Sequence, residues 1–280
     1  MNRRAFVLSS LGTAAIFPPP SGMTAPSRQS KRIVLIGGMK SHGRAQHDFP
    51  NGIPLLQSLL KRAEPFSGIQ IDAFPSGFPQ DLSLLDGAST LVFYFDGVQT
   101  PPAPLLDSAR IRALQKLMDA GAGLVCLHQA STVPQGDTTI PLIEWLGAKR
   151  NGMFDRITET ANLKSATPSF PVCRGMAPFT YEDEFYPTLI FTKDMKRVTP
   201  VLTPKLHVEY RDGEAVHSDE TNTYTVAWAY DRPGGGRSFG FTGCHYMAAF
   251  DQPQVRKMIL NAICWTTGLT VPAEGIVVTS

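Results

Sequence analysis

The sequence predicts an α/β protein built on a mostly parallel central sheet. From Lys31 onward, short apolar runs alternate with amphipathic helical stretches, which is the order of repeated strand–helix units. The run at residues 91–95 is apolar at every position, as in a strand that helices cover on both faces. The chain of 280 residues is long enough for one large domain with its own core or for two small domains, and we expect one domain.

Three strands and one helix are predicted in the first half of this region. The first strand, residues 33–36, ends at a glycine pair and leads into a loop that holds His42 and His47. A helix follows from about residue 51, because the leucines at positions 55, 56, 59 and 60 share one face. Residues 69–74 and 91–95 form the next two strands.

The second half is predicted to place an insertion between further strands and helices. A helix capped by Asp107 or Ser108 ends at Gly121, and a strand at residues 124–127 follows directly. Residues 152–220 break the rhythm with prolines and short alternating strands, which predicts an insertion packed beside the sheet. Strands at residues 224–230 and 238–242 enclose a glycine-rich turn, and a last helix extends from about residue 251 to residue 268.

The first 25 residues are typical of a targeting segment. Arg3 and Arg4 precede an uncharged stretch from residue 5 to residue 25, which resembles a twin-arginine export signal. A membrane anchor needs about 20 uninterrupted apolar residues, whereas Gly12 and the prolines at positions 18–20 interrupt this stretch. We therefore expect export to the periplasm and removal of this segment, which leaves an α/β domain from residue 31 to residue 280.

Charge and cysteine content exclude several classes of partner. The chain has 26 Lys and Arg against 24 Asp and Glu, so the domain without the two signal arginines is close to neutral. It offers no basic field for nucleic acid and no second apolar span for a membrane. Four cysteines are too few for a disulfide scaffold in a chain of this length, so we expect them to be buried as small apolar residues.

Three histidines follow three predicted strands. His42 lies after the strand at residues 33–36, His128 follows residues 124–127 directly, and His245 follows residues 238–242. In an open α/β sheet, ligands bind beyond the carboxyl ends of the strands. Imidazole transfers protons near neutral pH and is also the commonest protein ligand of zinc, so the sequence predicts one chemical centre built from histidine.

Acidic residues offer partners for these imidazoles. Three consecutive acids lie between aromatic residues at positions 181–186, and a carboxylate there could orient a histidine or complete a metal shell. Glu182 fits a solvated turn better, whereas Glu184, next to Phe185 and Tyr186, fits either interpretation. Asp96 follows residues 91–95 and could bind a substrate hydroxyl or form a turn before Gly97.

Other motifs carry weaker signals. The glycines at positions 234–236 join two strands, and residues 37–41 lack the spacing of a phosphate-binding loop, so no nucleotide cofactor is expected. His42 and His47 could both ligate a metal if their loop curls back, although they do not have the helical spacing of a metalloprotease. His207 and His217 lie among charged residues and are expected at the surface.

Taken together, these segments resemble the ThuA-like, or trehalose-utilisation, family, which has the fold of class I glutamine amidotransferases. The resemblance covers about residues 31–275. It rests on Lys40-Ser41-His42-Gly43 with His47, residues 123–128, residues 181–186, Val226-Ala227-Trp228, Gly243-Cys244-His245 and a closing helix with Trp265 and Gly268. It implies a flavodoxin-like three-layer sandwich with a mostly parallel sheet and an inserted irregular or β segment.

The resemblance also implies a role in sugar catabolism. The expected substrates are disaccharides or 3-keto-glycosides that a partner oxidoreductase supplies, and the expected chemistry is metal-dependent or acid/base. His128 falls at the corner where amidotransferases carry their nucleophilic cysteine, and Cys126 lies two residues earlier, inside the strand. Glutaminase activity is therefore not expected.

On this basis we expect an enzyme with a divalent metal ion, zinc being the first choice. The metal ligands are assigned to His42, His128 and His245, with Glu184 as general base or fourth ligand. His47 is expected either to support a ligand by a hydrogen bond or to relay protons. The remaining assignments are sugar contacts, at Asp96, Tyr186, Trp228 and Tyr246. A keto-sugar has an acidified proton beside its carbonyl, which suits isomerisation, elimination, hydration or hydrolysis.

Two other functions compete with this assignment. A non-catalytic carbohydrate-binding protein would use Trp228, Tyr186 and Tyr246 to stack on sugar rings, and a metal-free pocket with separated histidines would favour it. A serine or cysteine hydrolase is disfavoured, because the chain lacks a Gly-x-Ser-x-Gly nucleophile motif.

Overall fold

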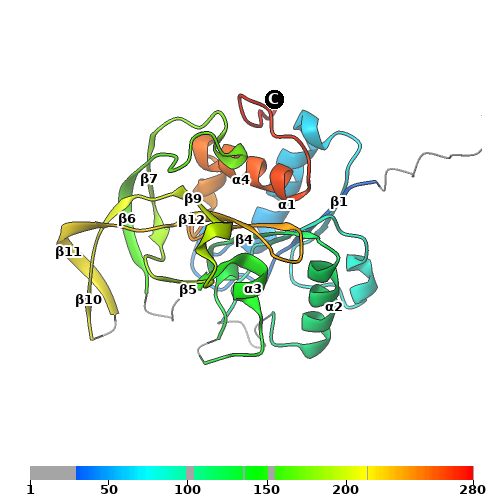
Figure 1. Cartoon of the computed structure of the whole chain (residues 1–280), viewed down its shortest axis with the longest axis horizontal. Coiled ribbons are helices and arrows are strands. Elements are labelled where there is room, and N and C mark those ends of the chain that lie inside the picture. The colour runs from blue at the N-terminus through cyan, green and yellow to red at the C-terminus, as the bar shows by residue number, and fades with distance from the viewer. Residues whose placement is uncertain (1–29, 99–103, 135, 151–154, 213, 280) are drawn as a thin grey trace, which may run out of the picture.

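The computed structural model describes residues 30–98, 104–134, 136–150, 155–212 and 214–279 (Figure 1). The predicted export signal at residues 1–25 lies outside the described residues. In the described part of the chain, no helix has both the length and the apolar character needed to cross a membrane.

A seven-stranded sheet forms the centre of the described fold. The strands lie in the order β2-β1-β3-β4-β13-β12-β9, in which the first five are parallel and β12 is antiparallel to both its neighbours. Their bounds are β1 (Arg32–Ile36), β2 (Gln70–Phe74), β3 (Thr90–Phe93), β4 (Gly123–Leu127), β9 (Val198–Leu202), β12 (Ala227–Asp231) and β13 (Arg237–Phe241). The carboxyl ends of the parallel strands therefore meet at one edge of the sheet.

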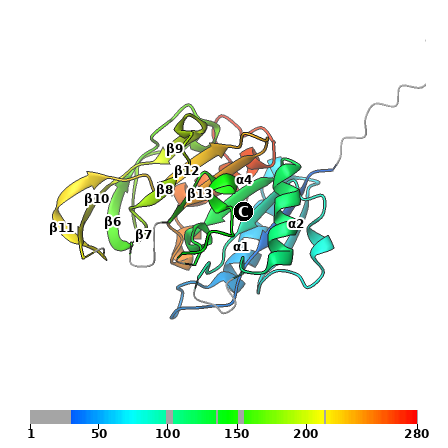
Figure 2. The same cartoon turned by 60° about the horizontal axis from the view of Figure 1, so that its bottom comes forward.

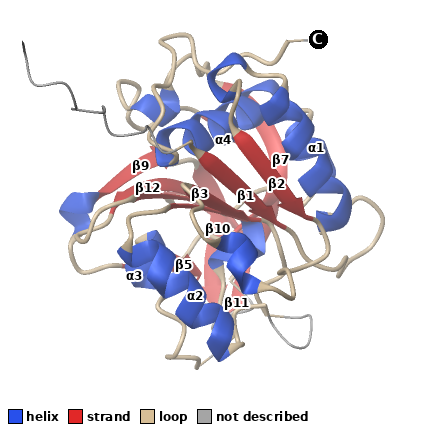
Figure 3. Cartoon of the chain, turned by 90° about the vertical axis from the view of Figure 1, so that its right-hand side faces the viewer, coloured by secondary structure: helices blue, strands red, loops and turns tan. Residues whose placement is uncertain are grey.

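Helices cover both faces of this sheet, which confirms the predicted three-layer α/β fold. Helices α1 (Phe49–Lys61) and α4 (Pro253–Thr266) pack on one face, and α2 (Ser108–Asp119) and α3 (Leu142–Leu146) pack on the other (Figure 3). The carboxylate of Asp107 caps α2 by accepting hydrogen bonds from two backbone N–H groups. Of the two candidate caps, Asp107 and Ser108, the first is therefore the cap. Helix α3 was not predicted, because five residues are too few to show a helical repeat.

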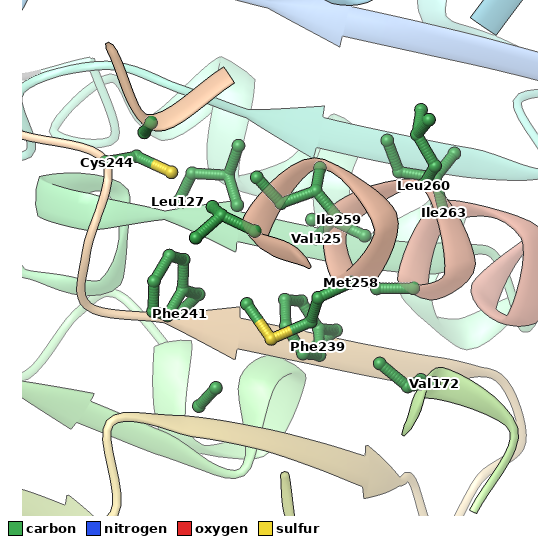
Figure 4. Packing of buried hydrophobic residues seen from close by; sticks show 14 of the residues in the cluster. Val125, Leu127, Val172, Phe239, Phe241, Cys244, Met258, Ile259, Leu260 and Ile263 are labelled. Carbon is green, nitrogen blue, oxygen red and sulfur yellow. The ribbon is translucent and has the colours of Figure 1, made fainter. Parts of the chain in front are cut away.

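The core between α4 and the sheet is made of large apolar side chains. Phe239 and Phe241 of β13 and Val125 of β4 contact the buried face of α4, where Met258 and Ile259 lie (Figure 4). All of these side chains are fully buried. Such close packing fixes the ends of β4 and β13 relative to one another, and both ends carry site residues.

The described part of the predicted insertion, residues 152–220, mainly forms small two-stranded sheets beside the central sheet, and the strand that precedes the insertion pairs with one of its strands. The small two-stranded sheets are β5 (Ala148–Arg150) with β8 (Leu189–Phe191), β6 (Ile157–Leu163) with β7 (Phe179–Phe185), and β10 (Lys205–Arg211) with β11 (Glu214–Thr223). The two-stranded sheets β6–β7 and β10–β11 lie together on one side of the molecule (Figures 1 and 2). One strand of the segment, β9, differs from the prediction and joins the central sheet, where Val201 and Leu202 are buried against β12.

Candidate metal centre

Three buried histidines come together at the carboxyl edge of the sheet. They are His47 in the loop after β1, His128 directly after β4, and His245 in the turn after β13. One ring nitrogen from each lies within 4.8 Å of the others, which is close enough to hold a single metal ion. His47 and His128 are fully buried, and His245 is 6% exposed.

The backbone at His128 has an unusual conformation. Its φ angle is 55°, in the left-handed region that side chains other than glycine rarely adopt. Strand β4 ends there and turns at once into a short 3₁₀ helix, His128–Ser131, whose Ser131 hydroxyl donates to the His128 carbonyl at 2.7 Å. This sharp turn aims the imidazole into the site, in the way a nucleophile elbow presents its reactive side chain.

Hydrogen bonds determine which nitrogen of His128 carries a proton. Its Nδ1 lies 2.7 Å from the carbonyl oxygen of Thr242, which can only accept, so Nδ1 is protonated and donates. In the neutral ring, Nε2 therefore carries a lone pair. That lone pair faces His47, His245 and the Tyr186 hydroxyl, at 2.9, 3.1 and 2.9 Å respectively.

A similar argument applies to His47. The hydroxyl of Ser41 donates to the Asp96 carboxylate at 2.8 Å and lies 2.8 Å from Nδ1 of His47, so it accepts from that nitrogen. Nε2 of His47 then carries a lone pair and faces Nε2 of His128 at 2.9 Å. Two lone pairs at that distance repel each other unless a proton or a metal ion lies between them.

The spacing of the imidazoles is compatible with a metal ion. Nitrogens that share one ion at roughly 2.0–2.1 Å lie about 3.0–3.4 Å apart, depending on the coordination geometry. The contacts of His128 with His47 and His245, 2.9 and 3.1 Å, are close to that range. The described residues therefore include a cluster that could hold one metal ion.

Burial keeps the imidazoles of His128 and His245 neutral. It is the main cause that lowers the pKa of His128 well below its usual value, with the neighbouring His47 and His245 adding to it. Burial, together with His47 and His42, lowers the pKa of His245 to about 3. Metal ions bind neutral imidazole, so this environment favours a metal over protons near neutral pH.

Asp183 holds the turn that carries His245, and the sequence did not single it out. Its fully buried carboxylate accepts backbone N–H bonds from Cys244 at 2.5 Å, His245 at 3.1 Å and Glu184 at 2.8 Å, and a further bond from the Tyr181 hydroxyl. Burial raises the pKa of Asp183 to about 7, although these bonds favour the ionised form. The available signal was period-2 alternation, which puts Asp183 with Tyr181 and Phe185 on the buried face of β7.

Glu184 lies beside the histidine cluster. Its Oε1 is 3.8 Å from both Nε2 of His128 and Nδ1 of His245, and its Oε2 is 3.4 Å from Nε of Arg156. Burial raises the pKa of Glu184, while Arg156 acts in the opposite direction. Of the two interpretations left open, the structure therefore places Glu184 at the site.

Tyr186 closes another side of the cluster. Its ring stacks on His128, with ring centroids 4.9 Å apart. The guanidinium carbon of Arg150 lies over the same ring, 3.8 Å from its centre. Burial raises the pKa of Tyr186 well above its usual value. The hydroxyl is consequently neutral and donates toward the His128 lone pair or toward a ligand.

The predicted residues occupy different places around the cluster. His42 is half-buried and lies against His47, with ring centroids 3.7 Å apart, so it belongs to the site but lies outside the closest trio. Asp96 is fully buried; it both accepts from Ser41 and forms the predicted turn, through the backbone N–H of Val98 at 3.0 Å. A second set of possible ligands, His42, His47 and Asp96, shares His47 with the first. Tyr246 is partly exposed beside His245.

Trp228 requires a correction. Its indole is fully buried, its Nε1 donates to the carbonyl of Leu146 at 2.9 Å, and its ring fills the space that a side chain at Gly240 would take. A ring packed in this way cannot stack on a sugar, so Trp228 is a core residue. The sequence prediction was wrong because aromatic side chains are used both for core packing and for stacking on ligands.

The cysteines are buried and unpaired, as predicted. Cys126 lies inside β4, and burial raises the pKa of its thiol. His128 occupies the corner where β4 ends. His207 is partly exposed and His217 exposed, in agreement with the prediction for both.

Fold and site together define a class of protein: a three-layer α/β protein with a mostly parallel central sheet and three buried imidazoles at the carboxyl ends of its strands. A family model described as "ThuA: Trehalose utilisation" matches residues 34–266. The chain therefore belongs to the ThuA family. No curated protein matches it.

Solved structures are similar to this chain in fold. A putative ThuA-like protein from Bacteroides uniformis is 14% identical, with a TM-score of 0.63 over 89% of this chain and 95% of that chain. A putative ThuA-like protein from Parabacteroides merdae is 12% identical, with a TM-score of 0.58 over 89% and 98%. A cytoplasmic protein from Salmonella typhimurium is 13% identical, with a TM-score of 0.52 over 84% and 98%. At these identities the likeness concerns the fold alone.

Proposed function

We propose that the protein is an enzyme that holds one divalent metal ion, zinc being the first choice, on His47, His128 and His245. The observation that carries this proposal is the 2.9 Å contact between two nitrogens whose hydrogen-bond partners leave each with a lone pair. A proton shared between these rings is the alternative, but it would place a charge where both side chains are fully buried. Three histidines also match the ligand number of catalytic zinc sites, which keep one position open.

The proposed reaction is acid/base chemistry on a keto-sugar, such as a 3-keto-glycoside or an oxidised disaccharide. When bound, the ion supplies Lewis-acid polarisation of a ligand oxygen. Glu184 is placed to take up the proton beside the sugar carbonyl, since its carboxylate lies 3.8 Å from two of the imidazoles. Ser41 and Asp96 fix the ring of His47, and Asp183 fixes the turn of His245.

The non-catalytic alternative receives less support. It required well-separated histidines and an aromatic platform for sugar rings. The imidazoles are instead clustered, and Trp228 is buried in the core. Tyr246 alone is a small platform for a carbohydrate-binding protein, so we favour the enzyme.

The metal content of the purified protein tests this proposal. We expect about one equivalent of zinc per chain, and removal of the ion by a chelator should lower the melting temperature by roughly 10 °C if the site is filled at about 1,000 times its dissociation constant. Elemental analysis and calorimetry measure the two quantities. A protein that holds no divalent ion, and whose melting temperature does not respond to added zinc, manganese or cobalt, would contradict the proposal.

We also propose that the enzyme acts in the periplasm, after export and next to an oxidoreductase that forms the keto-sugar. The twin arginine at Arg3 and Arg4 supports export, because the export receptor recognises guanidinium groups that lysine does not reproduce. Replacing both with lysine should leave unprocessed precursor in the cytoplasm, as judged by fractionation and immunoblotting. Normal processing of that variant would argue for a different route.

A further inference from the structure

Arg156 lies at the exposed side of the candidate metal centre. Its Nε is 3.4 Å from Oε2 of Glu184, and the other oxygen of that carboxylate faces His128 and His245. Burial is the main cause of the lowered pKa of His42 and of His245, and the positive charge of Arg156 adds to it for both. By geometry, the guanidinium is within ion-pair distance of Glu184, whose carboxylate lies beside two of the site imidazoles.

The burial pattern indicates from which side a ligand arrives. His47 and His128 are fully buried, and His245 is nearly so. By contrast, His42 is partly exposed and the Arg156 side chain is 46% exposed. Among the described residues of the site, Arg156 with the partly exposed His42 and Tyr246 therefore marks the side that faces solvent.

Charge on this side favours an anionic ligand. Three neutral histidines leave the two positive charges of a divalent ion in place, and Glu184 offsets one of them. Asp96 and Asp183 are fully buried behind His47 and His245, whose positions they fix. Arg156 therefore adds positive charge at the edge of the site where a ligand oxygen would lie, and its exposed side chain is screened in part by solvent.

We propose that Arg156 contacts the substrate directly, and that the substrate is an α-hydroxy ketone that becomes an enediolate. This inference rests on the proposed function and names the substrate class for the same site. The carbon beside the carbonyl loses its proton to Glu184, the C–H electron pair forms the C=C bond, and the carbonyl π pair moves onto oxygen as negative charge. Two neighbouring oxygens then face the site, and the planar guanidinium fork matches such a pair.

Cobalt(II)-loaded protein allows this contact to be measured without substrate. Oxalate, a planar anion with neighbouring oxygens, is the enediolate probe, and azide is the control ligand that needs only the ion. In Arg156→Gln we expect oxalate to bind on the order of 10- to 100-fold more weakly in a titration of the visible cobalt spectrum, since a charge-assisted pair is lost. The cobalt affinity should change by less than about twofold, because the ligating imidazoles are untouched. Azide, which offers no pair of neighbouring oxygens to the guanidinium fork, should lose clearly less affinity than oxalate.

Two further variants separate charge from geometry. Arg156→Lys keeps the charge without the fork and should bind oxalate with intermediate affinity. Arg211→Gln removes an exposed arginine that pairs with Glu209 on β10, and it should behave as wild type. If Arg156→Gln binds oxalate as tightly as wild type, or loses cobalt and azide affinity in parallel, Arg156 has no substrate contact. If the wild-type protein takes up no cobalt, the metal centre itself is wrong and this inference falls with it.

Discussion

Replacing His128 by alanine is expected to remove the metal ion and to abolish turnover of a keto-sugar. His128 contributes the nitrogen that faces both other imidazoles, at 2.9 and 3.1 Å, so no intact three-histidine set remains without it. Loss of a proton-transfer or electrostatic group alone typically costs about 10²–10⁴-fold in rate. Elemental analysis and steady-state kinetics on one purified preparation measure both effects.

Folding of the same variant should survive. The side chain loses its bond to the Thr242 carbonyl, but the repulsion between two facing nitrogens in the metal-free protein disappears as well. The φ angle of 55° remains costly for alanine, whereas glycine adopts it freely, so His128→Gly provides a second variant without backbone strain. The melting temperatures of both should be compared with metal-free wild type.

The opposite pattern would assign His128 a structural role. A variant that melts at a lower temperature yet keeps one equivalent of metal and normal turnover per folded molecule would remove His128 from the site. His217→Ala is the matched control, because that histidine is exposed on β11. It should leave metal content, turnover and melting temperature unchanged.

The second prediction with a large effect concerns zinc affinity, and it distinguishes a metal site that uses His47 from one that uses His42. His47→Ala should weaken zinc binding by more than about 100-fold, which exceeds the loss of 10- to 100-fold seen when an outer-shell partner is removed. His42→Ala should weaken zinc binding by no more than the loss of an outer-shell partner does, because His42 lies against His47 outside the closest trio. Competition with a chromophoric chelator measures both affinities under the same conditions.

A reversed order of these two variants would restore the ligand set that the sequence suggested. A large loss in His42→Ala with a small loss in His47→Ala would place the ion on His42, His128 and His245. Comparable large losses in both would indicate the set His42, His47 and Asp96, which shares one histidine with the first.

The sequence by itself determined most of the fold. Hydrophobic runs and helical repeats located β1, β2, β3, β4, α1, α2 and α4, because each of these elements buries a face that must be apolar. It also placed His128 and His245 at one edge of the sheet, since ligand sites of open α/β sheets lie beyond the carboxyl ends of the strands, where β4 and β13 both end. Short elements such as α3 lack a repeat long enough to be recognised, and β9 is recognisable as part of the sheet only through its pairing with β12.

Only the tertiary structure decided how the site is assembled. The loop after β1 could present either His42 or His47, and its backbone bond from His47 to the His245 carbonyl, at 3.0 Å, turns His47 inward. The roles of Asp183 and Trp228 also depended on tertiary contacts. Asp183, which had no predicted role, accepts hydrogen bonds from two amides of a turn some sixty residues away. Trp228, predicted to contact sugar, fills the core instead. Sequence pattern reports which face of an element is buried, whereas contacts between distant loops depend on how the packed elements bring those loops together.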